Sequence, residues 1–172
     1  MTFKSGFANE NSAVRAELAP GPLRKAAGFT YQEFSNLEKP LALKGDPFHV
    51  GDEANHVMTW AEFLKPDTAK PLAFYDHPFF GRWPAITRNE YGKGTLTYEG
   101  TAVSNPLQKA IVLDELKAVG LTGPDQALPP TVRVKHGLAH SGHKLHYFLN
   151  YASEPATFTY TCLLYTSDAA DE

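Results

Sequence analysis

Residues 87–120 have the sequence TRNEYGKGTLTYEGTAVSNPLQKAIVLDELKAVG, which predicts a strand, a turn, a second strand and a capped helix in direct succession. Between residues 95 and 99, threonine and glutamate alternate with apolar residues, as in a half-buried strand. The glycines of residues 92–94 permit the positive φ angles of a tight turn. We therefore expect residues 85–91 to pair with residues 95–100 as a hairpin.

A helix is predicted to follow, from residue 106 to residue 119. Ser104 or Asn105 can cap its first turn, and the fixed φ angle of Pro106 suits that turn. Gly120 can adopt the left-handed conformation that ends a helix. The two strands and this helix are therefore predicted to be structural scaffold, because they contain no pattern typical of a catalytic or binding site.

The apolar residues of this helix fall on two roughly opposite sides. Val112, Leu116 and Val119 form one side, and Leu107, Ile111 and Ala118 form the other. Two apolar sides imply two partners. The helix is either buried deep in one domain or placed between its own sheet and another domain or subunit.

Upstream of the hairpin, short elements follow one another in a rhythm that resembles a βαβ unit. Residues 1–4 are predicted as a short strand, residues 23–27 as a helix stopped by a glycine, and residues 29–34 as an extended segment. Residues 57–64 and 71–75 read as two more strands, the second in the central sheet. Between these segments, residues 41–49 show little periodicity.

Downstream of the helix, the composition changes. Residues 122–130 are rich in glycine and proline, as in a linker. An antiparallel β module is predicted after it, with strands at residues 132–138, 145–151 and 157–161. Three strands are too few to close a sandwich with covered edges, so this module is predicted to be cut short.

Composition excludes several classes of function. The chain has 172 residues, 42% of them apolar, and its 16 Lys and Arg are scattered, with a net charge of −3 that favours neither nucleic acid nor an anionic membrane. No stretch approaches the roughly 18 apolar residues of a spanning helix. The start lacks an apolar export signal, which favours a cytoplasmic protein. Cys162 is the single cysteine, so an internal disulfide and a multi-cysteine metal site are excluded.

Several stretches, in order, resemble glycoside hydrolase family 42 β-galactosidases from residue 1 to about residue 160. They are FKSGFANEN at 3–11, APGPLRKAAGFTYQEFSNL at 19–37, WAEFL at 60–64, LAFYDHPFFGRWPAITRNEYGKGTLTYEGT at 72–101, RVKHGL at 133–138 and YFLNYAS at 147–153. The combination of PGPLRKAAG, YQEF and PAITRNEYGKGTLTYEGT is fairly specific for this family, whereas each motif alone would be weak evidence for it.

The resemblance implies a catalytic (β/α)8 barrel, then an α/β trimerisation domain, then a small C-terminal β domain. The middle domain is expected to be a three-layer, flavodoxin-like fold similar to class I glutamine amidotransferases. We expect residues 1–121 to be this domain without its N-terminal part, 122–130 a linker and 131–161 a partial β domain. Residues 162–172, CLLYTSDAADE, are similar to translated sequencing adapter of metagenomic origin and are predicted to be a non-native tail.

The sequence supplies no catalytic pair. A retaining glycosidase needs two carboxyl groups about 5–5.5 Å apart, and the resemblance places both glutamates in the barrel. Six glutamates are expected to be surface or capping groups: Glu33, Glu53, Glu62, Glu90, Glu99 and Glu115. An amidotransferase-like cysteine nucleophile is missing, and Ser104 lies in a helix cap instead of a nucleophile elbow. The residues 92–95 fit a hairpin turn better than a phosphate loop.

Two other groups of residues are candidate binding sites. The first is a histidine cluster that could hold zinc or copper but fits structural or solvated histidines better: His136, His140, His143 and His146. The second is an aromatic loop that could stack on a sugar but fits burial against a partner domain better: Tyr75, His77, Phe79, Phe80 and Trp83. No metal, cofactor or substrate site is therefore predicted.

Two hypotheses remain. In the first, the chain is a non-catalytic assembly portion of a β-galactosidase that hydrolyses terminal β-D-galactosides by a retaining two-glutamate mechanism in a barrel absent from this sequence. Its partners are then neighbouring subunits of a homotrimer and that barrel, and only the parent binds the galactoside. In the second, it is a freestanding α/β binding or regulatory module with a β appendage.

Overall fold

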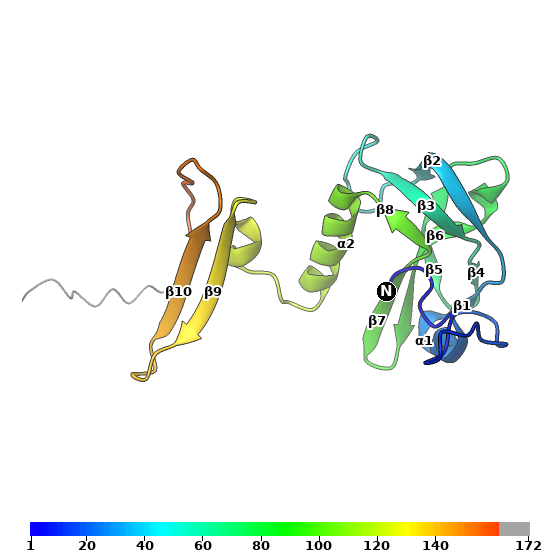
Figure 1. Ribbon diagram of the computed structural model, residues 1–172, viewed down its shortest axis with the longest axis horizontal. Helices are drawn as coiled ribbons and strands as arrows, with labels where there is room; N and C mark the ends of the chain where they lie inside the picture. Colours follow the sequence, from blue (N-terminus) through cyan, green and yellow to red (C-terminus); the bar gives the residue numbers. More distant parts are fainter. Residues whose placement is uncertain (162–172) are drawn as a thin grey trace, which may run out of the picture. The chain divides into compact units, whose positions relative to one another are not determined.

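A computed structural model describes residues 1–161 of the chain. The chain forms two compact units that divide between Asp114 and Glu115, within helix α2 (Asn105–Ala118). The first unit is built on a six-stranded sheet, and the second carries a two-stranded hairpin (Figure 1). Each unit is described by itself.

The sheet of the first unit has the strand order β7-β6-β5-β2-β3-β8, and all its neighbouring strands are antiparallel. The strands are β2 (Phe34–Lys44), β3 (His56–Glu62), β5 (Lys70–Tyr75), β6 (Pro84–Tyr91), β7 (Gly94–Glu99) and β8 (Thr101–Val103). The hairpin of β6 and β7 runs in register from Ile86 opposite Glu99 to Tyr91 opposite Gly94, which confirms the predicted pairing. The predicted strands at 57–64 and 71–75 are confirmed as β3 and β5.

Short elements precede the sheet or connect its strands. They are η1 (Gly21–Leu23), α1 (Arg24–Ala27), β1 (Phe29–Thr30), which pairs with β4 (Lys65–Pro66), and η2 (Phe80–Arg82). Gly28 ends α1 with a φ angle of 70°, and a Cβ there would lie 2.5 Å from Cγ of Asn89. A larger residue would therefore displace the Asn89 side chain, which donates to the Ala26 carbonyl at 2.9 Å.

Helix α2 begins and ends within one residue of the predicted range, 106–119. The backbone N–H of Leu107 donates to Oγ of Ser104 at 3.3 Å, so Ser104 is the cap. At the other end Gly120 has a φ angle of 68°, and its N–H donates to the Lys117 carbonyl at 3.1 Å. Local turn chemistry thus fixes both ends of the helix.

The two predicted sides of α2 differ in how far they are buried. Leu107 and Ile111 are 0% and 2% exposed and belong to the core of the first unit, whereas Val112 and Val119 are 48% and 64% exposed. Ala118 is exposed as well. The first unit therefore covers Leu107 and Ile111, and a cover for Ala118 by another domain or subunit stays a prediction.

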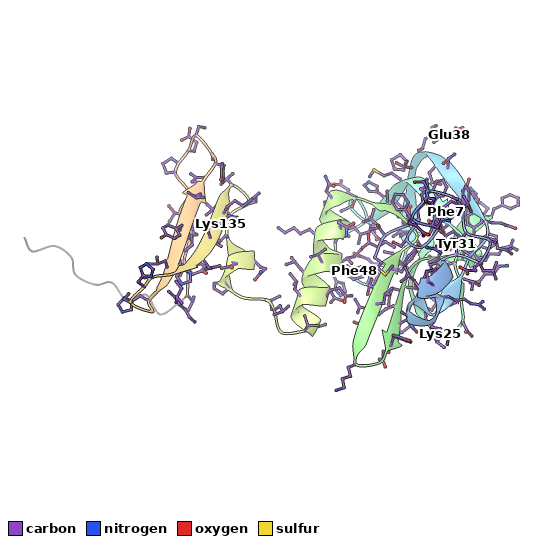
Figure 2. The ribbon with its side chains drawn as sticks, turned by 60° about the horizontal axis from the view of Figure 1, so that its bottom comes forward. Phe7, Lys25, Tyr31, Glu38, Phe48 and Lys135 are labelled. Carbon is purple, nitrogen blue, oxygen red and sulfur yellow. The ribbon has the colours of Figure 1, made fainter. Side chains whose placement is uncertain are left out.

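Two clusters of buried apolar side chains form the core of the first unit. One contains Leu43, Val57, Ala61, Phe63, Ala73, Tyr75, Ala85, Ile86, Leu107 and Ile111. The other contains Ala27, Phe29, Tyr31, Leu64, Ala69 and Tyr98. Phe7 packs against the second cluster, near Tyr31 (Figure 2). The first cluster thus packs α2 against the strands of the sheet.

Two predictions about strands in this unit are wrong. Residues 1–4 make a single bridge, between Thr2 and Glu99, and no strand. The stretch from residue 41, expected to be irregular, continues β2 as far as Lys44. The pairing of β2 with β3 shifts register between Leu37 and Leu41, where Pro40 lies, so the strand does not keep an even alternation.

The second unit contains η3 (Pro124–Ala127) and the antiparallel strands β9 (Val132–Leu138) and β10 (Lys144–Asn150). These two strands confirm the predicted hairpin. Residues 157–161 form no strand in the described chain, although Phe158 and Tyr160 contact the ring of Phe148. The prediction of a third strand there is wrong, because ring packing takes the place of backbone pairing.

The described residues thus show an antiparallel sheet with one long helix, followed by a hairpin. The three-layer, amidotransferase-like arrangement of the whole middle domain stays a prediction, as do the domain boundaries. The tail at 162–172, with Cys162, lies outside the described residues.

Candidate functional site

Glu62, the last residue of β3, has a completely buried side chain. Its Oε1 accepts hydrogen bonds from the backbone N–H of Lys4 at 2.7 Å and from the indole N–H of Trp60 at 3.2 Å. Its Oε2 accepts one from the hydroxyl of Tyr98 at 2.9 Å. Three donors therefore take the place of water around this carboxylate.

Buried tyrosines surround the same carboxylate. Burial raises the pKa of Tyr31, Tyr75 and Tyr98 well above the ordinary value, and the charge of Glu62 raises each of them further. These hydroxyls consequently stay protonated and able to donate. Tyr75 donates to the backbone carbonyls of Glu62 and Gly100 at 3.1 and 3.2 Å. The Tyr31 hydroxyl makes no hydrogen bond of normal geometry with the described residues.

Glu99, at the end of β7, is a second buried carboxyl group at 3% exposure. Burial raises the pKa of Glu99. A hydrogen bond of 3.1 Å from Gln108 of α2 to Oε1 of Glu99 offsets part of this rise in pKa. Its Oε2 has no partner among residues 1–161. Glu99 thus ties the sheet to α2.

The expectation that all six glutamates are surface or capping groups is wrong for two of them. Glu33, Glu53 and Glu90 are exposed and Glu115 is half-buried, but Glu62 and Glu99 are buried. The sequence did not reveal Glu62, because residues 60–64 are all buried and both faces of the strand are covered there. Both carboxylate oxygens of Glu62 accept hydrogen bonds from within the fold, which suits a structural role better than a catalytic one.

A surface cavity of about 380 Å³ lies in the first unit. Its lining combines aromatic, amide and charged side chains: Gln32, Glu33, Phe63, Lys65, Arg82 and Trp83. The rings of Phe63 and Trp83 stack with centroids 4.5 Å apart, and the Arg82 guanidinium lies 3.9 Å from the Trp83 ring centroid. The Trp83 ring thus packs against Phe63 and Arg82 of the same unit.

The aromatic loop packs largely on the same unit. Tyr75 is fully buried, and the ring of Phe80 lies 4.0 Å from that of His77 and 5.0 Å from that of Phe63. Phe79, in contrast, is 77% exposed. Burial of the loop against a partner domain stays a prediction, and only Phe79 offers it a large apolar surface.

The second unit brings together two of the four histidines of the predicted cluster. Nδ1 of His136 lies 2.8 Å from Nδ1 of His146, and Nε2 of His136 lies 2.8 Å from Oδ2 of Asp125. The Tyr160 hydroxyl donates to Oδ1 of Asp125 at 2.5 Å. His143 is bound separately, to Ser141 at 3.1 Å.

The aspartate beside His136 comes from outside the hairpin. Asp125 belongs to η3 in the predicted linker, and no pattern in the sequence connects a linker residue to a strand residue. Hydrogen bonds from Tyr160 and His136 lower the pKa of Asp125 below its ordinary value. Among residues 1–161, no group of three or more His, Cys, Asp or Glu is arranged to hold a metal ion.

Among these residues there is also no helix long and apolar enough to cross a membrane.

Comparison with known proteins identifies similar chains. The family described as the beta-galactosidase trimerisation domain matches residues 1–122. Beta-galactosidase BgaB of Geobacillus sp. is 35% identical over 101 residues, which is 59% of this chain and 15% of that protein. Beta-galactosidase Bga of Halorubrum lacusprofundi is 32% identical over 141 residues, 76% of this chain and 20% of that protein. The chain thus spans a fifth or less of the length of these relatives.

Solved structures show a similar fold. The beta-galactosidase from Bacillus circulans sp. alkalophilus superposes with a TM-score of 0.77 at 24% identity, over 89% of this chain and 23% of that one. The polyextremophilic beta-galactosidase from Halorubrum lacusprofundi gives a TM-score of 0.67 at 28% identity, over 88% of this chain and 21% of that one.

Proposed function

Because the chain belongs to the beta-galactosidase trimerisation domain family, we propose that it is a non-catalytic assembly portion of a β-galactosidase. The observation that carries this proposal is the family match over residues 1–122, which takes in the whole six-stranded sheet and α2. The buried glutamates support it, since Glu62 and Glu99 are engaged in holding the fold.

The parent protein, in this proposal, hydrolyses terminal β-D-galactosides with retention of configuration. One glutamate of its barrel acts as acid and base and the other as nucleophile, about 5–5.5 Å apart. The relatives that bear the name beta-galactosidase are several times longer than this chain, which leaves room for such a barrel. No residue of this chain is assigned a step in the reaction.

The partners proposed for this domain are neighbouring subunits of a homotrimer and the barrel of the parent. The family description, a trimerisation domain, supports the assembly role. The three-layer amidotransferase-like arrangement and a cytoplasmic location belong to the same proposal. A structure of the full-length parent would test the arrangement directly.

We expect the purified 172-residue chain to leave a chromogenic β-galactoside unhydrolysed, because the proposal places both catalytic glutamates in the barrel of the parent. Release of the chromophore should equal that of buffer alone. A sample to which a known β-galactosidase has been added controls for inhibition. Turnover that follows the chain through successive purification steps would contradict the proposed role.

Assembly gives a second prediction. The full-length parent should sediment as a trimer, and a parent from which the equivalent of residues 1–122 has been removed should sediment as a monomer. An unchanged trimer would show that another part of the parent holds the subunits together. An upstream reading frame that encodes no barrel would instead favour the freestanding binding or regulatory module.

A further inference from the structure

The hairpin of the second unit holds two histidines at chelating distance. We infer that His136 and His146 form a two-histidine site for a divalent transition metal, copper(II) above all, on the surface of β9 and β10. This inference is independent of the proposed function. It rests on register, tautomer, nitrogen separation and access.

The backbone fixes the positions of both rings. His136 of β9 and His146 of β10 are directly opposite each other in the antiparallel register, so their side chains emerge on the same face of the hairpin. Their ring centroids are 4.8 Å apart and their planes meet at 85°. A metal ion can therefore be shared without any movement of the strands.

Asp125 fixes the tautomer of His136. Its carboxylate accepts the hydrogen bond of 2.8 Å from Nε2, which places the proton of a neutral ring on Nε2 and leaves a lone pair on Nδ1. The second oxygen of Asp125 is held by Tyr160, so the carboxylate is itself oriented. A carboxylate behind a metal-binding histidine is the usual way in which proteins orient such a ligand.

The distance between the two Nδ1 atoms suits a shared metal ion. It is 2.8 Å. Two nitrogens that each lie about 2.0 Å from one ion, at right angles to each other, are about 2.8 Å apart. When the ion binds, the proton held between the two Nδ1 atoms moves to Nε2 of His146. Both rings therefore stay neutral, and the site loses no net proton. Small rotations of the rings then direct both lone pairs at the ion.

The number of ligands favours copper(II). The described residues provide two nitrogens and no third His, Cys, Asp or Glu to complete a set, so water would fill the other positions. Structural zinc sites need four protein ligands, whereas tetragonal copper(II) accepts nitrogen and water and binds most tightly in the divalent series. The His136 side chain is 48% exposed, which gives the ion access.

The test uses the full 172-residue chain and copper(II) chloride near neutral pH. Calorimetry should show one ion per chain, and the electron paramagnetic resonance spectrum should show coupling to two imidazole nitrogens. His136→Gln and His146→Gln should each weaken binding about tenfold or more, and Asp125→Asn by about 10–100-fold. The matched control, His140→Gln with His143→Gln, changes two histidines of the same hairpin and should leave the affinity within about twofold of wild type.

A second measurement does not depend on the variants. Substoichiometric copper(II) should broaden the ring proton signals of His136 and His146 in the wild-type spectrum before those of His140 and His143. Broadening that begins at His140, at His143 or at the amino terminus would overturn the inference. Wild-type affinity in both His136→Gln and His146→Gln, or the lack of stoichiometric binding, would overturn it equally.

Discussion

Replacement of Glu62 by leucine is expected to lower the free energy of unfolding by about 3 kcal/mol or more. The substitution leaves three donors without an acceptor: the backbone N–H of Lys4, the indole N–H of Trp60 and the hydroxyl of Tyr98. Each buried donor that loses its partner costs about 1–3 kcal/mol. Urea denaturation followed by tryptophan fluorescence would measure the loss, since Trp60 reports on this region.

Two further variants separate the lost hydrogen bonds from other effects. Glu62→Gln keeps the volume and an acceptor oxygen, so it should cost about 1–2 kcal/mol. Glu53→Leu makes the same change at an exposed position and should fall within about 0.5 kcal/mol of wild type. If Glu62→Leu were as stable as Glu53→Leu, the hydrogen bonds around Glu62 would not hold the fold together.

The hairpin of β6 and β7 and helix α2 could be predicted because their signals are local. Glycines at the turn, Ser104 at the cap and Gly120 at the end lie within a few residues of the structure that they determine. The alternation of polar and apolar residues along β7 predicts that strand correctly for the same reason. The long register shift in β2 breaks that alternation at Pro40, and the prediction failed there.

The environment of Glu62 could not be predicted, because its partners are distant in sequence. Lys4 is 58 residues away and Tyr98 is 36 residues away. A glutamate in a stretch that is buried on both faces carries no periodic signal to mark it as inward-facing. The pair of Asp125 and His136 is closer, at 11 residues, but a turn in a linker has no fixed position relative to a strand.

The fold also predicts opposite outcomes for two neighbouring residues of α2. Ile111→Glu should unfold the first unit or destabilise it by more than about 4 kcal/mol, because it places a carboxylate in an apolar core. Ile111 is 2% exposed and packs in the same cluster as Val57 and Ile86. Circular dichroism in urea would show either a lost transition or one shifted to much lower denaturant.

Val112→Glu is the matched control, because it introduces the same charge and the same helix propensity one residue later. Val112 is 48% exposed, so its variant should remain within about 0.5 kcal/mol of wild type. A soluble, fully folded Ile111→Glu would place Ile111 at a subunit interface instead of in the core. If Val112→Glu kept its stability but separated the subunits of the parent trimer, the exposed side of α2 would be the surface that the neighbouring subunit covers, and the second apolar side of the helix would have its partner.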